Sequence, residues 1–405
     1  MHRTERFALY VALTAMTALA IDGVLPAMPM IEADFALVPP YSGGQIVTVF
    51  VLGMALGELL IGPIIDATGR RPAVIAGLVI FAFGTILAGT ADTYEGVVLG
   101  RFVQGVGVAG PKIGTRAMIR DRYAGTDMAQ VMSVIFTLLI FIPMVAPAIG
   151  AAIAATSGWR GVFWAYLVMA VGLGAWLWLR HPETLPVEKR VPLQFRALVT
   201  NTRAVLSRSD VTPVIIATGL IFGAQLTYFA VAAELFTAVY GVATLMPAFF
   251  ALLATGTGAA LLLNSRFVGR TGMEAPVLMG LALLALSGTL LLAAAALTNG
   301  HPPFGIFLGF GWLGFFALGL LFGNLNALAM RPLGNLAGLA SSLIASVSSL
   351  VAFIFAFAIE VMADGPVWAI AWAFALAALL SGALIVRAIP ASLRRQIARF
   401  LHASQ

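Results

Sequence analysis

Four ionisable side chains interrupt long apolar stretches of this 405-residue sequence: Asp22, Glu58, Arg101 and Lys112. A charge inside a membrane is costly, so residues of this kind are rare there and mark ion or substrate pathways. Two acids and two bases could exchange protons or pair with one another. They therefore predict coupling of proton movement to that of a second solute, with purely structural ion pairs as the alternative.

The depth of the outer two charges follows from the rise of about 1.5 Å per residue in a helix. Asp22 lies roughly 24 Å from Arg6 by that rise. Arg101 lies roughly 28 Å from Arg120. We expect Asp22 and Arg101 at a similar level. If their helices are neighbours, proton uptake by the carboxylate would release the guanidinium. The alternatives are a structural ion pair, or Asp22 capping a helix break at Pro26.

The inner two charges share a second level. Glu58 precedes Asp66 by two helical turns, roughly 12 Å, and Lys112 precedes Arg120 by the same offset. Opposite charges at one depth suggest mutual compensation. In the functional interpretation Glu58 is a proton site and Lys112 meets an anionic substrate. In the other interpretation they form a buried structural salt bridge.

Composition indicates the surroundings of these charges. Apolar residues make up 61% of the sequence and charged residues 10%, whereas soluble proteins carry about 25% charged residues. Lipid is the natural solvent for such a chain. There is no cysteine, which excludes disulfides and thiolate metal sites.

Runs of about 20 mainly apolar residues predict about twelve transmembrane helices. The predicted spans are 7–29, 45–65, 72–91, 95–118, 128–155, 160–180, 213–235, 245–267, 275–297, 304–329, 337–361 and 366–388. We expect an all-α membrane protein with an N-terminal bundle of six helices (1–185), a cytoplasmic linker (186–212) and a second bundle of six (213–405). Residues 193–206 could form a short helix on the inner leaflet.

The distribution of Lys and Arg predicts the orientation. With a cytoplasmic N-terminus, nearly all of them outside the spans fall on cytoplasmic segments or helix ends, Arg116 included, and only Arg160 falls opposite. Both termini are then cytoplasmic. The net charge of +6 is a topology signal, and we expect no nucleic-acid partner.

The strongest local motif joins the second and third spans, where residues 62–72 read GPIIDATGRRP. Gly69 suits a tight turn because it tolerates positive φ, and Asp66 can accept hydrogen bonds from Arg70. The motif resembles the loop signature of the major facilitator superfamily. The resemblance implies a charge latch that closes the cytoplasmic side, formed by Asp66, Gly69, Arg70 and Arg71.

A weaker copy of this loop occurs at the corresponding place in the second half. Residues 264–272 read NSRFVGRTG, with Asn264 where Asp66 would be. Matching loops in two halves are expected of parallel internal repeats.

Three further segments narrow the resemblance to the drug:proton antiporter branch, of the bicyclomycin/chloramphenicol-resistance type. They are IDGVLPAMP at 21–29, RFVQGVG at 101–107 and PMVAPAIG at 143–150. The resemblance implies that Pro143, Pro147 and Gly150 form the antiporter signature of the fifth helix. It also places the helices that carry Asp22 and Arg101 side by side along a central cavity.

The second half is nearly free of charge within its spans. Gln225, Tyr228 and Asn324 are the candidate substrate contacts there. Small polar residues also bond across helices, which is the structural alternative.

These features together predict a secondary transporter that exports small amphipathic or drug-like molecules against inward proton flow, as a monomer in a bacterial inner membrane. A proton-coupled uptake symporter for a small nutrient is the alternative, and a lipid-modifying membrane enzyme is less favoured because no convergent acid/base set is evident. The sequence has no phosphate-binding loop for ATP. We expect no cofactor and no metal site, and the partners are the substrate, protons and the bilayer.

Overall fold

The computed structural model describes residues 1–38, 40–123, 127–128, 131, 134–135, 138, 141–193 and 195–388. Within these ranges the chain is helical and contains no strand. The longer helices of the first half are α1 (Arg3–Asp22), α2 (Met28–Asp34), α3 (Gln45–Thr68), α4 (Arg70–Gly89), α5 (Tyr94–Arg122) and α7 (Ile142–Arg180). Those that follow are α8 (Phe195–Leu206), α9 (Thr212–Glu234), α10 (Met246–Thr271), α11 (Glu274–Leu297), α12 (Phe304–Met330), α13 (Ala337–Met362) and α14 (Pro366–Ala388).

Ten helical stretches of the described chain are long and apolar enough to cross a membrane. The stretch Ile142–Arg180 counts once, although Gly158 at φ 67° divides it into two helices. The charged helix α5 is not among the ten, yet it packs between α3 and α4. These ten, α5 and the second part of α7 account for the predicted spans. The start of the predicted span 128–155 lies partly outside the described residues.

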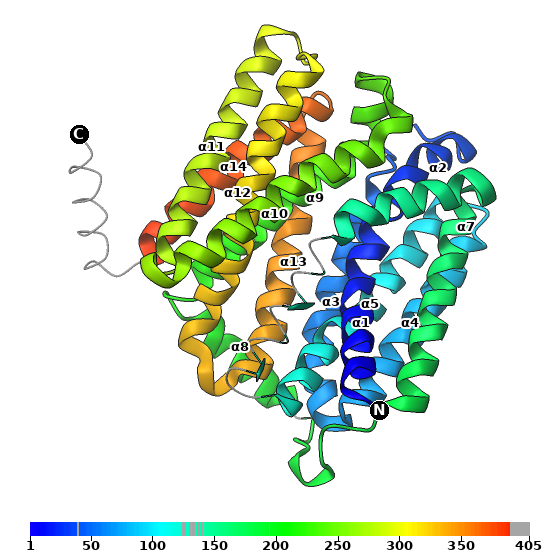
Figure 1. Cartoon of the computed structure of the whole chain (residues 1–405), viewed down its shortest axis with the longest axis vertical. Coiled ribbons are helices and arrows are strands. Elements are labelled where there is room, and N and C mark those ends of the chain that lie inside the picture. Colours follow the sequence, from blue (N-terminus) through cyan, green and yellow to red (C-terminus); the bar gives the residue numbers. More distant parts are fainter. Residues whose placement is uncertain are drawn as a thin grey trace.

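The helices form two bundles that lie side by side (Figure 1). The first half, coloured from blue to the green end of α7, meets the second half, coloured green to red, where α3 packs on α13 and α7 packs on α10. The structure confirms the all-α fold of two helical bundles. The predicted short helix near 193–206 is confirmed as α8, which lies at the same end of the molecule as the N-terminus. Its place on a lipid leaflet stays a prediction.

Glycines bring α3 and α5 into close contact beside the predicted site. A Cβ on Gly105 would lie 2.0 Å from the Phe50 carbonyl oxygen, and one on Gly53 would lie 2.1 Å from the Phe102 carbonyl oxygen. Small residues allow membrane helices to approach closely. This crossing holds the charged side chains of α3 and α5 next to each other.

The two ends of the bundles differ. We name them by residue: the Arg70 end carries the turn between α3 and α4, and the Ser42 end lies opposite. At the Ser42 end the halves touch, since the Ser42 hydroxyl donates to Glu360 Oε1 at 2.6 Å. A Cβ on Gly44 would lie 2.7 Å from the Ala230 carbonyl oxygen of the other half. These contacts close the Ser42 end.

Candidate functional site

Arg101 is a fully buried cation at the centre of the first bundle. Its guanidinium donates to the Ala20 carbonyl oxygen at 3.1 Å, to the Ile46 carbonyl oxygen at 3.0 Å and to Gln104 Oε1 at 2.8 Å. It also lies 4.3 Å from the centre of the Phe50 ring. These bonds join α1, α3 and α5, so the predicted proximity of the helices that carry Asp22 and Arg101 is confirmed.

The predicted ion pair between Asp22 and Arg101 is not formed within the described residues. Asp22 is 3% exposed and ends α1, whereas Arg101 uses its donors on two backbone carbonyls and Gln104. The Ala20 carbonyl in the last turn of α1, where a helix leaves carbonyls unsatisfied, and the Ile46 carbonyl of α3 compete with the carboxylate for the guanidinium. The alternative role of Asp22 as a cap is also not observed, because the turn that follows (Leu25–Ala27) has no side-chain cap. Asp22 is therefore a buried acid without a cationic partner in this part of the chain.

The fifth-helix motif packs directly on this break. A Cβ on Gly150 would lie 1.9 Å from the carbonyl oxygen of Gly23, so only glycine fits there. Tyr166, further along α7, donates its hydroxyl to the Leu19 carbonyl oxygen at 3.1 Å. Pro147 lies inside α7, and Pro143 borders the cavity described below. The motif thus positions the segment that carries Asp22.

The predicted contact between Glu58 and Lys112 is formed. Lys112 Nζ lies 2.5 Å from Glu58 Oε1, and the Glu58 side chain is fully buried. The Ser349 hydroxyl of α13 donates to Glu58 Oε2 at 2.9 Å. The neighbouring Ser346 donates to the Ala55 carbonyl oxygen at 2.7 Å. Glu58 therefore lies at the interface between the two halves.

Arg116 has a different position from the cytoplasmic helix end that the sequence predicted for it. In the structure it lies inside the bundle and lines the cavity between the halves. Its Nε is buried and makes no hydrogen bond among the described residues. The signal that could have found it is its position four residues after Lys112, which puts both side chains on one face of α5.

The turn between α3 and α4 has the predicted geometry. Gly69 adopts φ 109°, a conformation that residues with a Cβ rarely adopt. Arg70 is 5% exposed and donates to Asp66 Oδ1 at 2.5 Å, to Asp121 Oδ2 at 2.9 Å and to the Ile65 carbonyl oxygen at 3.1 Å. All three partners belong to the first half.

Glu183 is a further acid of this turn that sequence reasoning missed. Its carboxylate accepts from the backbone amides of Arg70 and Arg71, each at 3.0 Å. A carboxylate at a helix N-terminus satisfies free amides and complements the helix dipole. Arg71 itself donates to the Trp178 carbonyl oxygen and lies over the Trp178 ring. The gate candidates thus form one network with the segment that follows α7.

The second copy of the loop has the glycine turn of the first copy but lacks an acid equivalent to Asp66. Gly272, at φ 74°, ends α10 as Gly69 ends α3. Asn264 lies further from its turn than Asp66 does, so it does not occupy the place of Asp66. It instead accepts a hydrogen bond of 2.8 Å from the Asn324 amide of α12.

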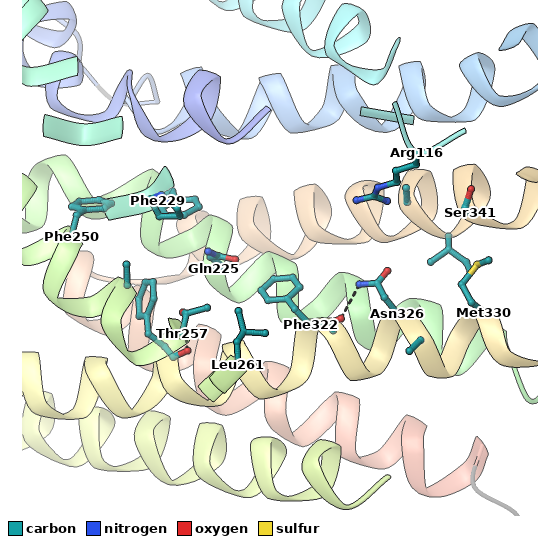
Figure 2. Close-up of a pocket in the computed structure, with 17 residues that line it drawn as sticks. Arg116, Gln225, Phe229, Phe250, Thr257, Leu261, Phe322, Asn326, Met330 and Ser341 are labelled. Atoms are coloured by element: carbon teal, nitrogen blue, oxygen red, sulfur yellow. Dashed lines mark hydrogen bonds between the residues drawn. The ribbon is translucent and has the colours of Figure 1, made fainter. Parts of the chain in front are cut away.

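A cavity of about 630 Å³ lies between the halves and extends toward the Arg70 end. Phe229, Phe250 and Phe315 form its apolar inner part. Its polar lining residues are Arg116, Gln225, Thr257, Asn326 and Ser341. Figure 2 shows Phe229 and Phe250 at one end of the view and Arg116 and Ser341 at the other. The cavity is amphipathic along its length, with a cation near its Arg70 end.

Of the four predicted substrate contacts, Gln225 lines the cavity, whereas Tyr228, Asn324 and Lys112 are not among its lining residues. Tyr228 lies behind its wall, with its ring centre 5.1 Å from that of Phe250 and its hydroxyl without a partner in the described chain. Asn324 bonds to α10, and Lys112 pairs with Glu58. Substrate roles for these residues stay predictions.

Two helical bundles around a central cavity define a membrane transporter, and the chain belongs to the Major Facilitator Superfamily, whose model matches residues 10–356. A bicyclomycin resistance protein homolog of Haemophilus influenzae is 30% identical over 338 residues, which is 83% of each chain. A chloramphenicol resistance protein of Pseudomonas aeruginosa is 29% identical over 288 residues, 69% of this chain and 65% of that protein. The resemblance predicted from the sequence motifs is thereby confirmed.

A solved structure supports the fold. The xylose transporter XylE of E. coli, in a partially occluded inward open conformation, superposes with a TM-score of 0.74 at 14% identity. The alignment covers 96% of this chain and 98% of that one. At this identity the likeness concerns the fold alone.

Proposed function

We propose that this protein exports small amphipathic or drug-like molecules from the cytoplasm across a bacterial inner membrane, driven by inward proton flow. The amphipathic cavity between the two halves carries the proposal. It is large enough for a drug-sized ligand, since such sites usually have volumes of roughly 300–1,000 Å³. The names of the relatives, which refer to bicyclomycin and chloramphenicol resistance, favour export of compounds of that kind.

Alternating access is the proposed mechanism. The Ser42–Glu360 contact closes one end while the cavity extends toward the other, an arrangement that corresponds to the inward-facing state if the termini are cytoplasmic. Rocking of the halves would open the Ser42 end and bring the Arg70 network against the second half. The protein would work as a monomer, because one chain supplies both walls of the cavity.

Asp22 and Glu58 are the proposed proton sites. Both carboxyl groups are buried. Burial and nearby charges determine whether such a group is ionised, so a conformational change that alters them also changes its protonation. Arg101 would hold the helix break beside Asp22 in place. Glu58 would be sensitive to the separation of the halves, because its carboxylate accepts a hydrogen bond from Ser349 of the second half.

Transport into everted membrane vesicles tests the direction. With the interior acidified, export predicts accumulation of chloramphenicol inside the vesicles, abolished by a protonophore. The vesicle control carries Asp22→Asn, which removes a proposed proton site. Accumulation only under the reversed gradient would instead identify a proton-coupled uptake symporter.

A further inference from the structure

Arg116 lines the cavity near its Arg70 end, and the ion pair of Lys112 and Glu58 lies behind that lining, with Lys112 one helical turn before Arg116 on α5. Lys112 is paired with Glu58 at 2.5 Å. Arg116 also lies within electrostatic range of Glu58, but that carboxylate is occupied by Lys112 and Ser349. With Glu58 ionised, the group therefore carries one uncompensated positive charge.

No other acid is available to neutralise Arg116. All acidic residues of the sequence lie within the described part of the chain, and Glu58 is the one that acts on Arg116. Asp66 and Asp121 are held by Arg70 at the turn. A partly buried guanidinium without a counter-ion is unfavourable, and its donors remain available to a ligand.

The rest of the cavity determines the shape of such a ligand. Figure 2 shows Arg116 and the aromatic residues Phe229 and Phe250 well separated along the cavity, with Gln225 between them. A guanidinium binds oxyanions through paired hydrogen bonds, and the aromatic end favours an apolar ring. One molecule could satisfy both ends only if its anionic group and its apolar body were joined.

We infer that Arg116 binds the anionic group of the cargo, so that the preferred substrates are amphipathic anions with one carboxylate or sulfonate on an aromatic or aliphatic body. The inference rests on the proposed function, whose substrate class it specifies. It moves the anion-binding role that the sequence suggested for Lys112 by one helical turn. The physical reason is that Glu58 already neutralises Lys112.

A matched pair of probes tests this inference by equilibrium binding. 1-Anilinonaphthalene-8-sulfonate and N-phenyl-1-naphthylamine share one aromatic body and differ in a single sulfonate. Binding to the purified full chain in nanodiscs, corrected for empty nanodiscs of the same lipid, should favour the sulfonate by about tenfold. Arg116→Gln should abolish this preference and leave the neutral probe unchanged, which also reports that the variant is folded.

Arg266→Gln is the control, because Arg266 is an exposed cation on α10, another helix that lines the cavity. It should keep the preference for the sulfonate. Equal binding of the two probes to the unmodified protein, or an unchanged preference in Arg116→Gln, would overturn the inference. Proton-driven transport of the neutral probe would then still uphold the proposed function. Sulfonate-selective binding that depends on Arg116, without proton-driven export of either probe, would uphold the anion site and contradict export.

Discussion

The Ser349 hydroxyl donates a hydrogen bond of 2.9 Å to Glu58 Oε2 and so joins the two halves of the transporter through a buried carboxylate. On its other side the same carboxylate contacts Lys112. A change of charge on Glu58 would therefore alter a contact within the first half and one between the halves. This double contact is the physical basis for assigning Glu58 to coupling.

Glu58→Gln should give folded protein whose transport depends less on pH. The amide keeps a hydrogen bond to Ser349 but cannot titrate, and it leaves Lys112 without its counter-ion. The measurement is the initial rate of transport in everted vesicles across a series of pH values. Ser349→Ala is the matched control, because it removes the bond and keeps the carboxylate. Identical pH profiles for Glu58→Gln and the unmodified protein would exclude Glu58 as a proton site.

Asp22→Asn should lower proton-driven transport by about tenfold or more, which corresponds to about 1.4 kcal/mol in the barrier. Asp22 is buried and has no cationic partner in the described chain, so a neutral amide should leave folding and probe binding intact. Exposed Asp92 provides the control variant Asp92→Asn. Full proton-driven activity in Asp22→Asn would contradict the assignment.

Gly150→Ala should destabilise the folded protein by about 1–3 kcal/mol, the usual cost of overpacking. The new methyl group would lie 1.9 Å from the Gly23 carbonyl oxygen, and it would push α7 away from the break after Asp22. The midpoint of thermal unfolding in detergent measures the effect. Gly172→Ala in the second part of α7 is the matched variant, because a Cβ there meets nothing within 4 Å. Equal midpoints for the two variants would show that this packing is not tight.

Asp66→Asn should increase access to the cavity from the Arg70 end. The latch is proposed to stabilise the state in which the Arg70 end is closed. Removing about 1 kcal/mol of this stabilisation would shift the equilibrium between closed and open states about fivefold toward the open state. The native chain has no cysteine, so Asn326→Cys supplies one labelling site in the cavity wall. Its reaction with a membrane-impermeant maleimide reports the open fraction. Wild-type labelling together with a wild-type transport rate would rule out the latch.

His181 predicts loss of stability in acid. Burial, assisted by the positive charge of Arg122, lowers the pKa of His181 to about 4, while an unfolded histidine titrates near pH 6.5. Between these values the unfolded chain binds the extra proton, so stability is fully present above about pH 6.5 and declines as the pH falls toward 4. The Tyr10 hydroxyl lies 2.9 Å from His181 Nε2. In a His181→Gln variant the glutamine amide would keep a hydrogen bond to this hydroxyl.

Thermal midpoints measured from pH 7.5 to pH 4.5 test this expectation. His181→Gln should show a smaller decline over that range than the unmodified protein, because glutamine does not titrate. A steeper decline in the variant would mean that other groups determine the acid sensitivity.

Much of the molecule follows from local properties of the sequence. The membrane spans follow from apolar runs, and the turn at Gly69 follows from glycine and charge at a helix end. The depths of Glu58 and Lys112 follow from counting helical rise, and these two residues do meet. Each of these inferences needs only neighbours within one or two helices.

Tertiary structure decided which charges pair and which face the cavity. Similar depth, together with the family resemblance that places their helices side by side, suggested that Asp22 meets Arg101, but the backbone carbonyls of Ala20 and Ile46 accept hydrogen bonds from the guanidinium instead. Glu58, Lys112 and Ser349 come together from three helices. Because Glu58 pairs with Lys112, it does not form an ion pair with Arg116. A sequence determines how deep a residue lies along its helix, whereas the direction in which its side chain points depends on how neighbouring helices rotate and pack.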